Sequence, residues 1–387
     1  EASDTEAAII EAATAINAAL GPGAADLAIV HLTPHHASGW SRVPELLRRA
    51  LPGAVVVGAS GAGIVGGGHE VEHRRGLAIM AASLPGVKLH PFHIDAGALP
   101  AGDDPAQRWR DVVGLQGDDD SHFLLFPDPF TCDIEHLLAG LDLAWPGTTK
   151  VGGGASGGTM PGANVLFCGD RAHNVGVVGL ALSGDITVDA VVAQACRPIG
   201  EPMLITRCLG SVVHELNSEA PVAVLRGLYA NLDSRDRRLF RNSLFVGIEI
   251  DGAREDYGPG DFLVRNITGM DAEDGAISVA ARPLQWQVLQ FHLRDARTAA
   301  TELTAAMERY VATSAPVSGA LMFNCVGRGL HLFGRPDHDT DIVQEHLPNV
   351  PLGGALCNGE IGPVDGRTLM HGYTSVFALF RALPDVD

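Results

Sequence analysis

Reactive, charged and polar side chains, with a glycine beside them, follow several predicted strands in the C-terminal part of the chain, at the strand ends where loop sites usually lie. These residues are Cys325, Arg328, Asn358, Gly359, Glu360 and His371. Arg328 could clamp a carboxylate or a phosphate through two parallel hydrogen bonds. Glu360 could hold an amine, and Cys325 with His371 could form a thiolate pair for nucleophilic catalysis. The pattern predicts a small-ligand site, with a cysteine enzyme as the less favoured interpretation.

A structural interpretation of the same residues stays open beside the functional one. Arg328 and Glu360 could form an internal ion pair that braces two loops. Cys325 would then be a small buried apolar side chain, as unpaired cysteines often are. On that interpretation the residues would stabilise the fold without binding a ligand.

Two glycine-rich loops in the N-terminal half complete the predicted site, because glycine allows a close approach of the backbone to a ligand. The loop residues are Gly58, Ser60, Gly63, Gly152, Gly154 and Ser156. Both loops match the G-x-G-x-x-G pattern, but neither opens a helix that could receive a pyrophosphate. Ser156 also fits a G-x-S-x-G pattern, but Pro161-Gly162 argues against the helix that a nucleophile elbow needs. We therefore expect turns between strands rather than a nucleotide site or a serine hydrolase.

These loops belong to a pattern that occurs three times in the chain. Pro52-x5-Gly58-x4-Gly63, Pro146-x5-Gly152-x4-Gly157 and Pro348-x5-Gly354-x4-Gly359 fit one template. Each match follows a predicted strand and helix and precedes another strand. We interpret the three segments as diverged copies of one supersecondary unit, an internal repeat.

The order of predicted strands and helices along the chain indicates a mixed α/β (α+β) fold of two related halves. Its mixed sheets are expected to be built from repeated strand-helix-strand-strand units. A leading helix is expected over 4–20, a hairpin over 203–216 and the longest helix over 293–312. The charged stretch 233–241 reads as a linker. We therefore expect two domains, at 1–240 and 241–387, as the typical domain length of about 100–200 residues suggests for a chain of 387 residues.

Composition excludes several classes of function. The 387 residues include 27 Lys and Arg against 46 Asp and Glu, a formal net charge of −19. Such an acidic chain is not expected to bind nucleic acid or an anionic membrane unaided. The six cysteines form no C-x-x-C pair, which favours a reduced, cytoplasmic setting. The sixteen histidines show no convergent ligand set, so no metal site is predicted.

The C-terminal motifs resemble the FIST domain family. The resemblance rests on Cys325-x-x-Arg328-Gly329, on Gly-Glu-Ile-Gly-Pro at 359–363 and on His-Gly-Tyr-Thr at 371–374. Upstream, the segment 46–63 resembles the N-terminal half of the same family. Together these segments extend the resemblance over about residues 25–380, nearly the whole chain.

The resemblance implies a sensory or signal-transduction protein that binds a small, amino-acid-like ligand, and we expect this ligand between the halves, with Arg328 binding an anionic group. Some bacterial family members are described as haem-binding nitric-oxide sensors that work with histidine kinases, so haem and a separate kinase are alternatives. No haem ligand can be assigned to a particular histidine here. A protein-interaction scaffold is a further alternative. Eukaryotic members carry an F-box, which the resemblance does not place in this sequence.

Overall fold

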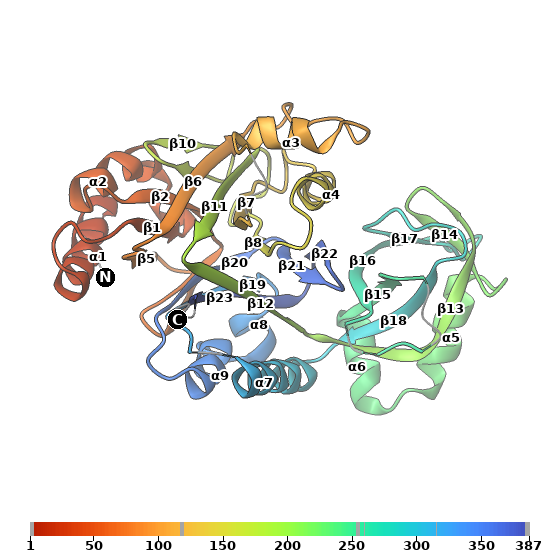
Figure 1. Ribbon diagram of the computed structural model, residues 1–387. Coiled ribbons are helices and arrows are strands. Elements are labelled where there is room, and N and C mark those ends of the chain that lie inside the picture. Colours follow the sequence, from red (N-terminus) through yellow and green to blue (C-terminus); the bar gives the residue numbers. More distant parts are fainter. Residues whose placement is uncertain (1–3, 117–119, 253–255, 259, 315, 384–387) are drawn as a thin grey trace. The chain divides into compact units, whose positions relative to one another are not determined.

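The computed structural model describes residues 4–116, 120–252, 256–258, 260–314 and 316–383 (Figure 1). The chain forms two compact units. Unit 1 comprises Glu1–Val192, Thr304–Met370 and Thr374–Asp387, and unit 2 comprises Ala193–Leu303 with His371–Tyr373. The domain boundary expected at residue 240 lies inside unit 2. None of the described helices combines the length and apolar character needed to span a bilayer.

Three copies of one strand-helix-strand unit build unit 1. The first copy contains α1 (Thr5–Leu20), β1 (Leu27–Leu32), η1 (Pro34–Arg42), α2 (Val43–Ala50), β2 (Val55–Ser60), β3 (Gly63–Gly66), β4 (His69–Glu72), β5 (Leu77–Ala82) and β6 (Val87–Ile94). The second contains α3 (Ala106–Val113), β7 (His122–Pro127), α4 (Ile134–Ala144), β8 (Lys150–Gly153), β9 (Leu166–Cys168), β10 (Arg171–His173), β11 (Val177–Gly184) and β12 (Ile186–Gln194). The third contains α7 (Ala296–Thr313), β19 (Gly319–Cys325), α8 (Gly329–Phe333), α9 (His338–His346), β20 (Leu352–Cys357), β21 (Glu360–Val364), β22 (Arg367–His371) and β23 (Thr374–Ala382).

Strand pairing confirms the predicted repeat. In each copy the first two strands are parallel: β1 with β2, β7 with β8, and β19 with β20. Gly58, Gly152 and Gly354 occupy one equivalent position in these pairs. A Cβ added at any of the three would lie 1.9–2.0 Å from a carbonyl oxygen of the neighbouring strand. Glycine is therefore required there because two backbones approach closely.

The three sheets exchange hairpins. Their strand orders are β10-β9-β2-β1-β5 (first sheet), β22-β21-β8-β7-β11-β6 (second sheet) and β12-β23-β19-β20-β3-β4 (third sheet). The hairpin that follows β2 extends the third sheet, the hairpin after β8 extends the first, and the hairpin after β20 extends the second. Each copy thus supplies part of its neighbour's sheet.

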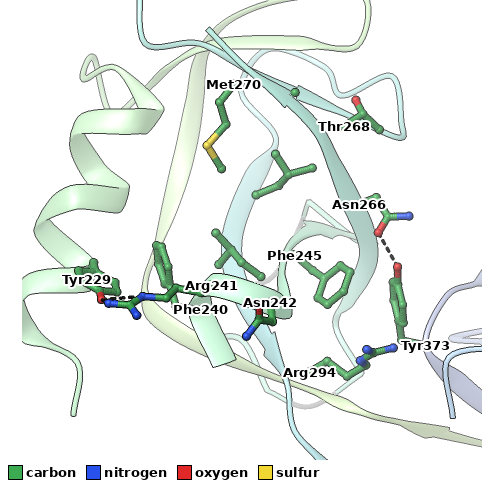
Figure 2. A pocket seen from close by; sticks show the side chains of 13 residues that line it. Tyr229, Phe240, Arg241, Asn242, Phe245, Asn266, Thr268, Met270, Arg294 and Tyr373 are labelled. Atoms are coloured by element: carbon green, nitrogen blue, oxygen red, sulfur yellow. Dashed lines mark hydrogen bonds between the residues drawn. The ribbon is translucent and has the colours of Figure 1, made fainter. Parts of the chain in front are cut away.

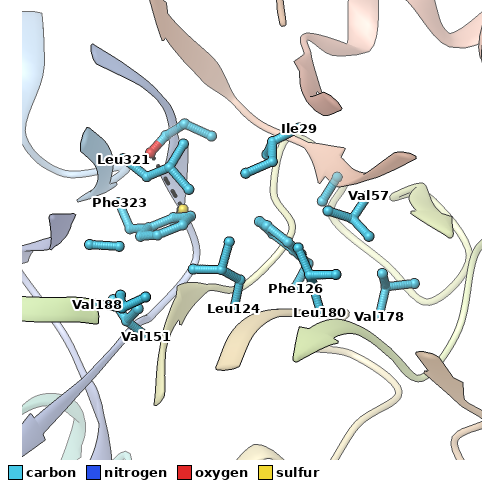
Figure 3. Packing of buried hydrophobic residues seen from close by; sticks show 14 of the residues in the cluster. Ile29, Val57, Leu124, Phe126, Val151, Val178, Leu180, Val188, Leu321 and Phe323 are labelled. Carbon is cyan, nitrogen blue, oxygen red and sulfur yellow. Dashed lines mark hydrogen bonds between the residues drawn. The ribbon is translucent and has the colours of Figure 1, made fainter. Parts of the chain in front are cut away.

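The inner faces of the three sheets enclose one apolar core (Figure 3). Ile29, Phe126 and Phe323 come from β1, β7 and β19, and all three side chains are buried there. A second cluster packs α3 and α4 on the second sheet, and a third packs α1 and α2 on the first. The strands are apolar on both faces because helices and neighbouring sheets cover them.

Unit 2 is built on a small closed barrel. The barrel order is β13-β14-β17-β16-β15-β18. Its elements are β13 (Cys196–Leu209), β14 (Val212–Leu216), α5 (Pro221–Asn231), α6 (Ser234–Asn242), β15 (Leu244–Glu249), β16 (Phe262–Met270), β17 (Ile277–Val279) and β18 (Val288–Arg294). The hairpin predicted over 203–216 is confirmed by antiparallel pairing of β13 with β14.

The linker predicted over 233–241 is wrong, because this segment forms the helix α6. Asp233 caps the helix by accepting a hydrogen bond from the backbone N–H of Asp236 at 2.7 Å. Leu239 and Phe240 pack against the apolar core of the barrel. A helix rich in charge can therefore form here, since a cap and two apolar side chains anchor it.

Candidate functional site

Arg328 lies in unit 1 and is fully buried. Its Nε and Nη2 donate to the two carboxylate oxygens of Asp339 at 2.7 and 2.9 Å. Asn324 Nδ2 also donates to Asp339, at 2.9 Å. Burial alone would raise the pKa of Asp339, but the charge of Arg328 and the hydrogen bonds from His338 and Arg328 hold it well below its ordinary value. Arg328 therefore makes the two parallel hydrogen bonds expected of it to a carboxylate of the same protein, not to a ligand.

Glu360, the ion-pair partner considered for Arg328, is fully buried as well. One of its oxygens accepts a hydrogen bond from the backbone N–H of Thr374 at 3.2 Å. Burial raises the pKa of Glu360 well above its ordinary value, although Thr374 and Arg328 oppose this. Asp339, rather than Glu360, is therefore the carboxylate that accepts the two hydrogen bonds of Arg328.

Two cysteines lie beside this cluster. Cys325 ends β19 and pairs in register with Cys357, the last residue of β20. Both are buried, with 7% and 3% of their surfaces exposed. Burial also raises the pKa of the Cys357 thiol well above its ordinary value. The surroundings of Cys357 therefore suit packing better than a thiolate nucleophile, whereas Cys325 lies close to the charge of Arg328.

The glycine-rich loops of the three copies meet and bind one another. Gly154 donates its N–H to the carbonyl of Gly359 at 2.9 Å, and Asn358 donates to the carbonyl of Gly154 at 3.0 Å. Ser156 Oγ accepts from the N–H of Ala62 at 2.8 Å and donates to the carbonyl of Leu356. The structure thus brings predicted loop residues together, and they satisfy each other's polar groups.

Ser60 contributes to the same meeting of loops. Its carbonyl accepts from the N–H of Ser156 at 3.0 Å, and its Oγ accepts from the N–H of Val165 at 3.2 Å. His371 is buried too, but it belongs to unit 2 with Gly372 and Tyr373. None of the predicted site residues lines either of the two cavities described next.

The larger cavity lies in unit 2 and has a volume of about 800 Å³ (Figure 2). It is formed by the ends of α5 and α6, strands β15, β16 and β18, and the short segment 371–373. The lining residues are Tyr229, Phe240, Arg241, Asn242, Leu244, Phe245, Asn266, Ile267, Thr268, Gly269, Met270, Arg294 and Tyr373. This volume lies in the range of metabolite and drug-sized ligand sites.

Two guanidinium groups face this cavity beside aromatic rings. Arg241 Nε donates to the hydroxyl of Tyr229 at 3.1 Å, and the Arg241 guanidinium lies 5.6 Å from the centre of that ring. The Arg294 guanidinium lies 5.3 Å from the ring centre of Tyr373 and 6.0 Å from that of Phe245. The rings hold both cations in place by cation–π attraction.

Tyr373, a residue of the His-Gly-Tyr-Thr motif at 371–374, lines the cavity. Its backbone φ is +61°, which is unusual for a bulky residue. Its hydroxyl donates to Asn266 Oδ1, and its carbonyl accepts from the N–H of Ala195 at 3.2 Å. These contacts fix the ring at the cavity wall despite the backbone strain.

The lining chemistry restricts what this cavity can hold. Its thirteen residues include two arginines but no carboxylate, histidine or cysteine. Within the described lining, tyrosine and methionine are the only side chains that could serve as an axial haem ligand, so a histidine-ligated haem does not fit it. Among the residues that the structure describes, no group of three His, Cys, Asp or Glu is placed to hold a metal ion.

A second cavity in unit 2 measures only about 60 Å³. Cys196, His292 and Glu302 are among its lining residues. Burial lowers the pKa of His292 to about 4, opposed by its hydrogen bond to the carbonyl of Gln290 at 3.0 Å. A neutral histidine in a space of this size is a packed core residue rather than a ligand site.

Sequence reasoning missed the larger cavity. Tyr229, Asn266 and Arg294 come from separate elements and form no motif. Arg241 lies in the stretch expected to be a linker. The available signals were the four arginines at 235–241 and the position of Tyr373 in a recognisable motif.

Comparisons with known proteins cover nearly the whole chain. The FIST N domain model matches residues 26–219, and the FIST C domain model matches residues 221–363. An uncharacterized protein of Mycobacterium tuberculosis (strain ATCC 25618 / H37Rv) is 35% identical over 387 residues, which covers 98% of this chain and 97% of the relative. An uncharacterized protein of Mycobacterium bovis is 34% identical over 386 residues, which covers 97% and 96%.

A more distant match is human F-box only protein 22. It is 33% identical over 95 residues, which covers 20% of this chain and 24% of that protein. The two family models together confirm the resemblance seen in the motifs. The chain belongs to the FIST family.

Proposed function

We propose that this FIST protein is a sensory module that binds a small anionic ligand with a flat, apolar part in the larger cavity of unit 2. The observation that carries the proposal is the charge of the cavity wall. Among the described residues, two arginines and no carboxylate line the cavity, in a chain whose net charge is −19. Such a local reversal of charge attracts anions and raises their concentration at the site.

The geometry supports recognition of a carboxylate beside a ring. An arginine can bind a carboxylate or phosphate through two parallel hydrogen bonds. Phe245, Tyr373 and Phe240 offer apolar ring surface next to the guanidinium groups, and Asn266 and Thr268 offer neutral polar groups. The wall therefore offers ring surface, neutral polar groups and two cations to one ligand.

Binding without turnover is the favoured activity for this cavity. The titratable side chains of its lining are arginine and tyrosine. General acid–base catalysis near neutral pH usually needs a histidine, carboxylate or lysine at the reacting atoms. Output through a separate signalling protein, such as a histidine kinase, is part of the proposal.

Calorimetric titration with benzoate tests the recognition of an anion, and benzamide serves as its neutral counterpart. We expect Arg294→Gln and Arg241→Gln to weaken benzoate binding about 10–100-fold, because each removes a charge-assisted hydrogen bond of about 1.5–3 kcal/mol. Arg238→Gln is the matched control, since Arg238 lies on α6 but does not line the cavity. Equal affinity for both probes, or for all three variants, would contradict the proposal.

A further inference from the structure

One sheet of unit 1 is a strand short. The second and third sheets have six strands, and the first has five. β6 pairs antiparallel with β11 in the second sheet, and β12 lies beside β23 in the third. The equivalent place beside β5 holds no strand among the residues that the structure describes. β5 is therefore an edge strand where its two counterparts are interior strands.

β5 has the character of an interior strand. Its sequence, Leu77-Ala-Ile-Met-Ala-Ala82, is apolar throughout, and all six residues are half-buried. The equivalent stretches, residues 177–182 of β11 and 374–379 of β23, are fully buried. Exposed edge strands usually carry a charge, a proline or a bulge that prevents pairing. β5 has no charged residue and no proline.

Backbone groups of alternate residues point away from β1. The carbonyls of Gly76 and Ala82 accept hydrogen bonds from Thr33 and Asp26, each at 2.9 Å, so the even-numbered residues face β1. In an antiparallel ladder the odd-numbered residues then face outward. Leu77, Ile79 and Ala81 present their N–H and C=O groups to the outer edge.

The two ends of β5 carry opposite charges. Arg74 and Arg75 are exposed just before it. Asp26 lies at the other end, where it accepts a hydrogen bond from the N–H of Leu84 at 2.6 Å. If two copies of β5 pair antiparallel about Ile79, residue 75 of one copy faces residue 83 of the other. The basic end of each strand then meets the acidic end of its counterpart.

We propose that β5 pairs antiparallel with β5 of a second copy of this chain, centred on Ile79, and joins the two first sheets into one. A two-fold axis generates this pairing, and the orientation matches that of β6 beside β11. The partner strand completes the first sheet as β6 and β12 complete the other two.

Sedimentation analysis of the full chain tests the proposal. We expect a mass of twice 40.5 kDa at micromolar concentrations and above. Ala81→Pro removes an outward N–H and leaves the β1 ladder intact, so this variant should be monomeric. Arg75→Glu should also favour the monomer, because it places like charges at both ends. Adding Asp26→Lys to Arg75→Glu should restore the dimer.

Amide hydrogen exchange along β5 tests the same pairing independently of the mass. The amides of Leu77, Ile79 and Ala81 should exchange slowly in the dimer and at least about tenfold faster in the Arg75→Glu monomer. A wild-type protein that stays at 40.5 kDa would overturn the proposal. So would a dimer that survives both Ala81→Pro and Arg75→Glu, or slow exchange of the three amides in the monomer, which would mean that another segment covers the edge.

Discussion

Alanine substitutions at the three equivalent glycines test the packing of unit 1. In Gly152→Ala the added Cβ would lie 2.0 Å from the carbonyl oxygen of Leu125 on the parallel neighbour strand. In Gly58→Ala it would lie 1.9 Å from the carbonyl oxygen of Val30, and the backbone φ of +149° adds strain. The first variant thus isolates the close approach, and the second adds an unfavourable conformation.

The size of each effect follows from these distances. A carbon and an oxygen without a bond between them need more than 3 Å, so two buried strands must separate by about 1 Å. Forced separation in a packed core typically costs 1–3 kcal/mol, and a strained φ adds about 1–2 kcal/mol. We expect Gly152→Ala to lower the free energy of unfolding by about 3 kcal/mol and Gly58→Ala by about 4 kcal/mol.

Gly67→Ala is the matched control. Gly67 has a φ of +60°, and an added Cβ would meet no atom within 4 Å. Only the conformational cost of about 1 kcal/mol should remain. Urea unfolding followed by tryptophan fluorescence measures these values, because Trp109 and Trp145 are buried in unit 1. If Gly152→Ala costs no more than Gly67→Ala, the inference that close strand approach requires glycine is refuted.

Two further predictions concern the buried charges of unit 1. Burial and the nearby charge of Asp339 raise the pKa of Glu70 from 4.5 to about 7. The folded protein therefore keeps a proton that the unfolded chain loses, and the free energy of unfolding should fall by about 3 kcal/mol as the pH rises from 4.5 to 7. Urea titrations across this range should show no such fall in Glu70→Gln. Asp339→Leu should lower the free energy of unfolding by about 3–5 kcal/mol, because it leaves Arg328 buried and unpaired. The double variant Arg328→Leu/Asp339→Leu should lower it by less, since no buried charge is left. A larger loss in the double variant would contradict this prediction.

Much of the architecture of unit 1 could be predicted from local sequence. The leading helix expected over 4–20 is found at Thr5–Leu20, and the helix and strands around the three glycine templates are present. These elements are apolar runs between clear stops such as Pro52-Gly53. A buried strand and a following turn leave a strong local signal, because both depend on residues that are adjacent in the chain.

The hairpin exchange could not be predicted in the same way. β3–β4, β9–β10 and β21–β22 are short strands, and some are polar, as His69–Glu72 shows. Each finds its partner in another copy, far away in the sequence. Long-range pairing of this kind leaves no periodic pattern in the segment itself.

The partner of Arg328 was missed for a related reason. Asp339 lies eleven residues further on, within a short acidic run at 337–341 that belongs to none of the predicted site motifs. In the structure Glu70, from another copy, accepts hydrogen bonds from the N–H groups of Asp339 and Thr340 at 3.0 and 2.9 Å. Because Glu70 caps the helix, the carboxylate of Asp339 is left to bind Arg328.

The positions of the motif residues separate two tasks within the FIST fold. Gly359 and Ser156 join the loops of different copies, and Arg328 and Glu360 are fully buried in the same unit. Substitutions at these positions should therefore act first on stability. Tyr373, in contrast, stands at the wall of a cavity in the unit inserted between the second and third copies. An inserted barrel can change its cavity residues without disturbing the exchanged hairpins, so under the proposed function we expect ligand preference among FIST proteins to vary mainly there.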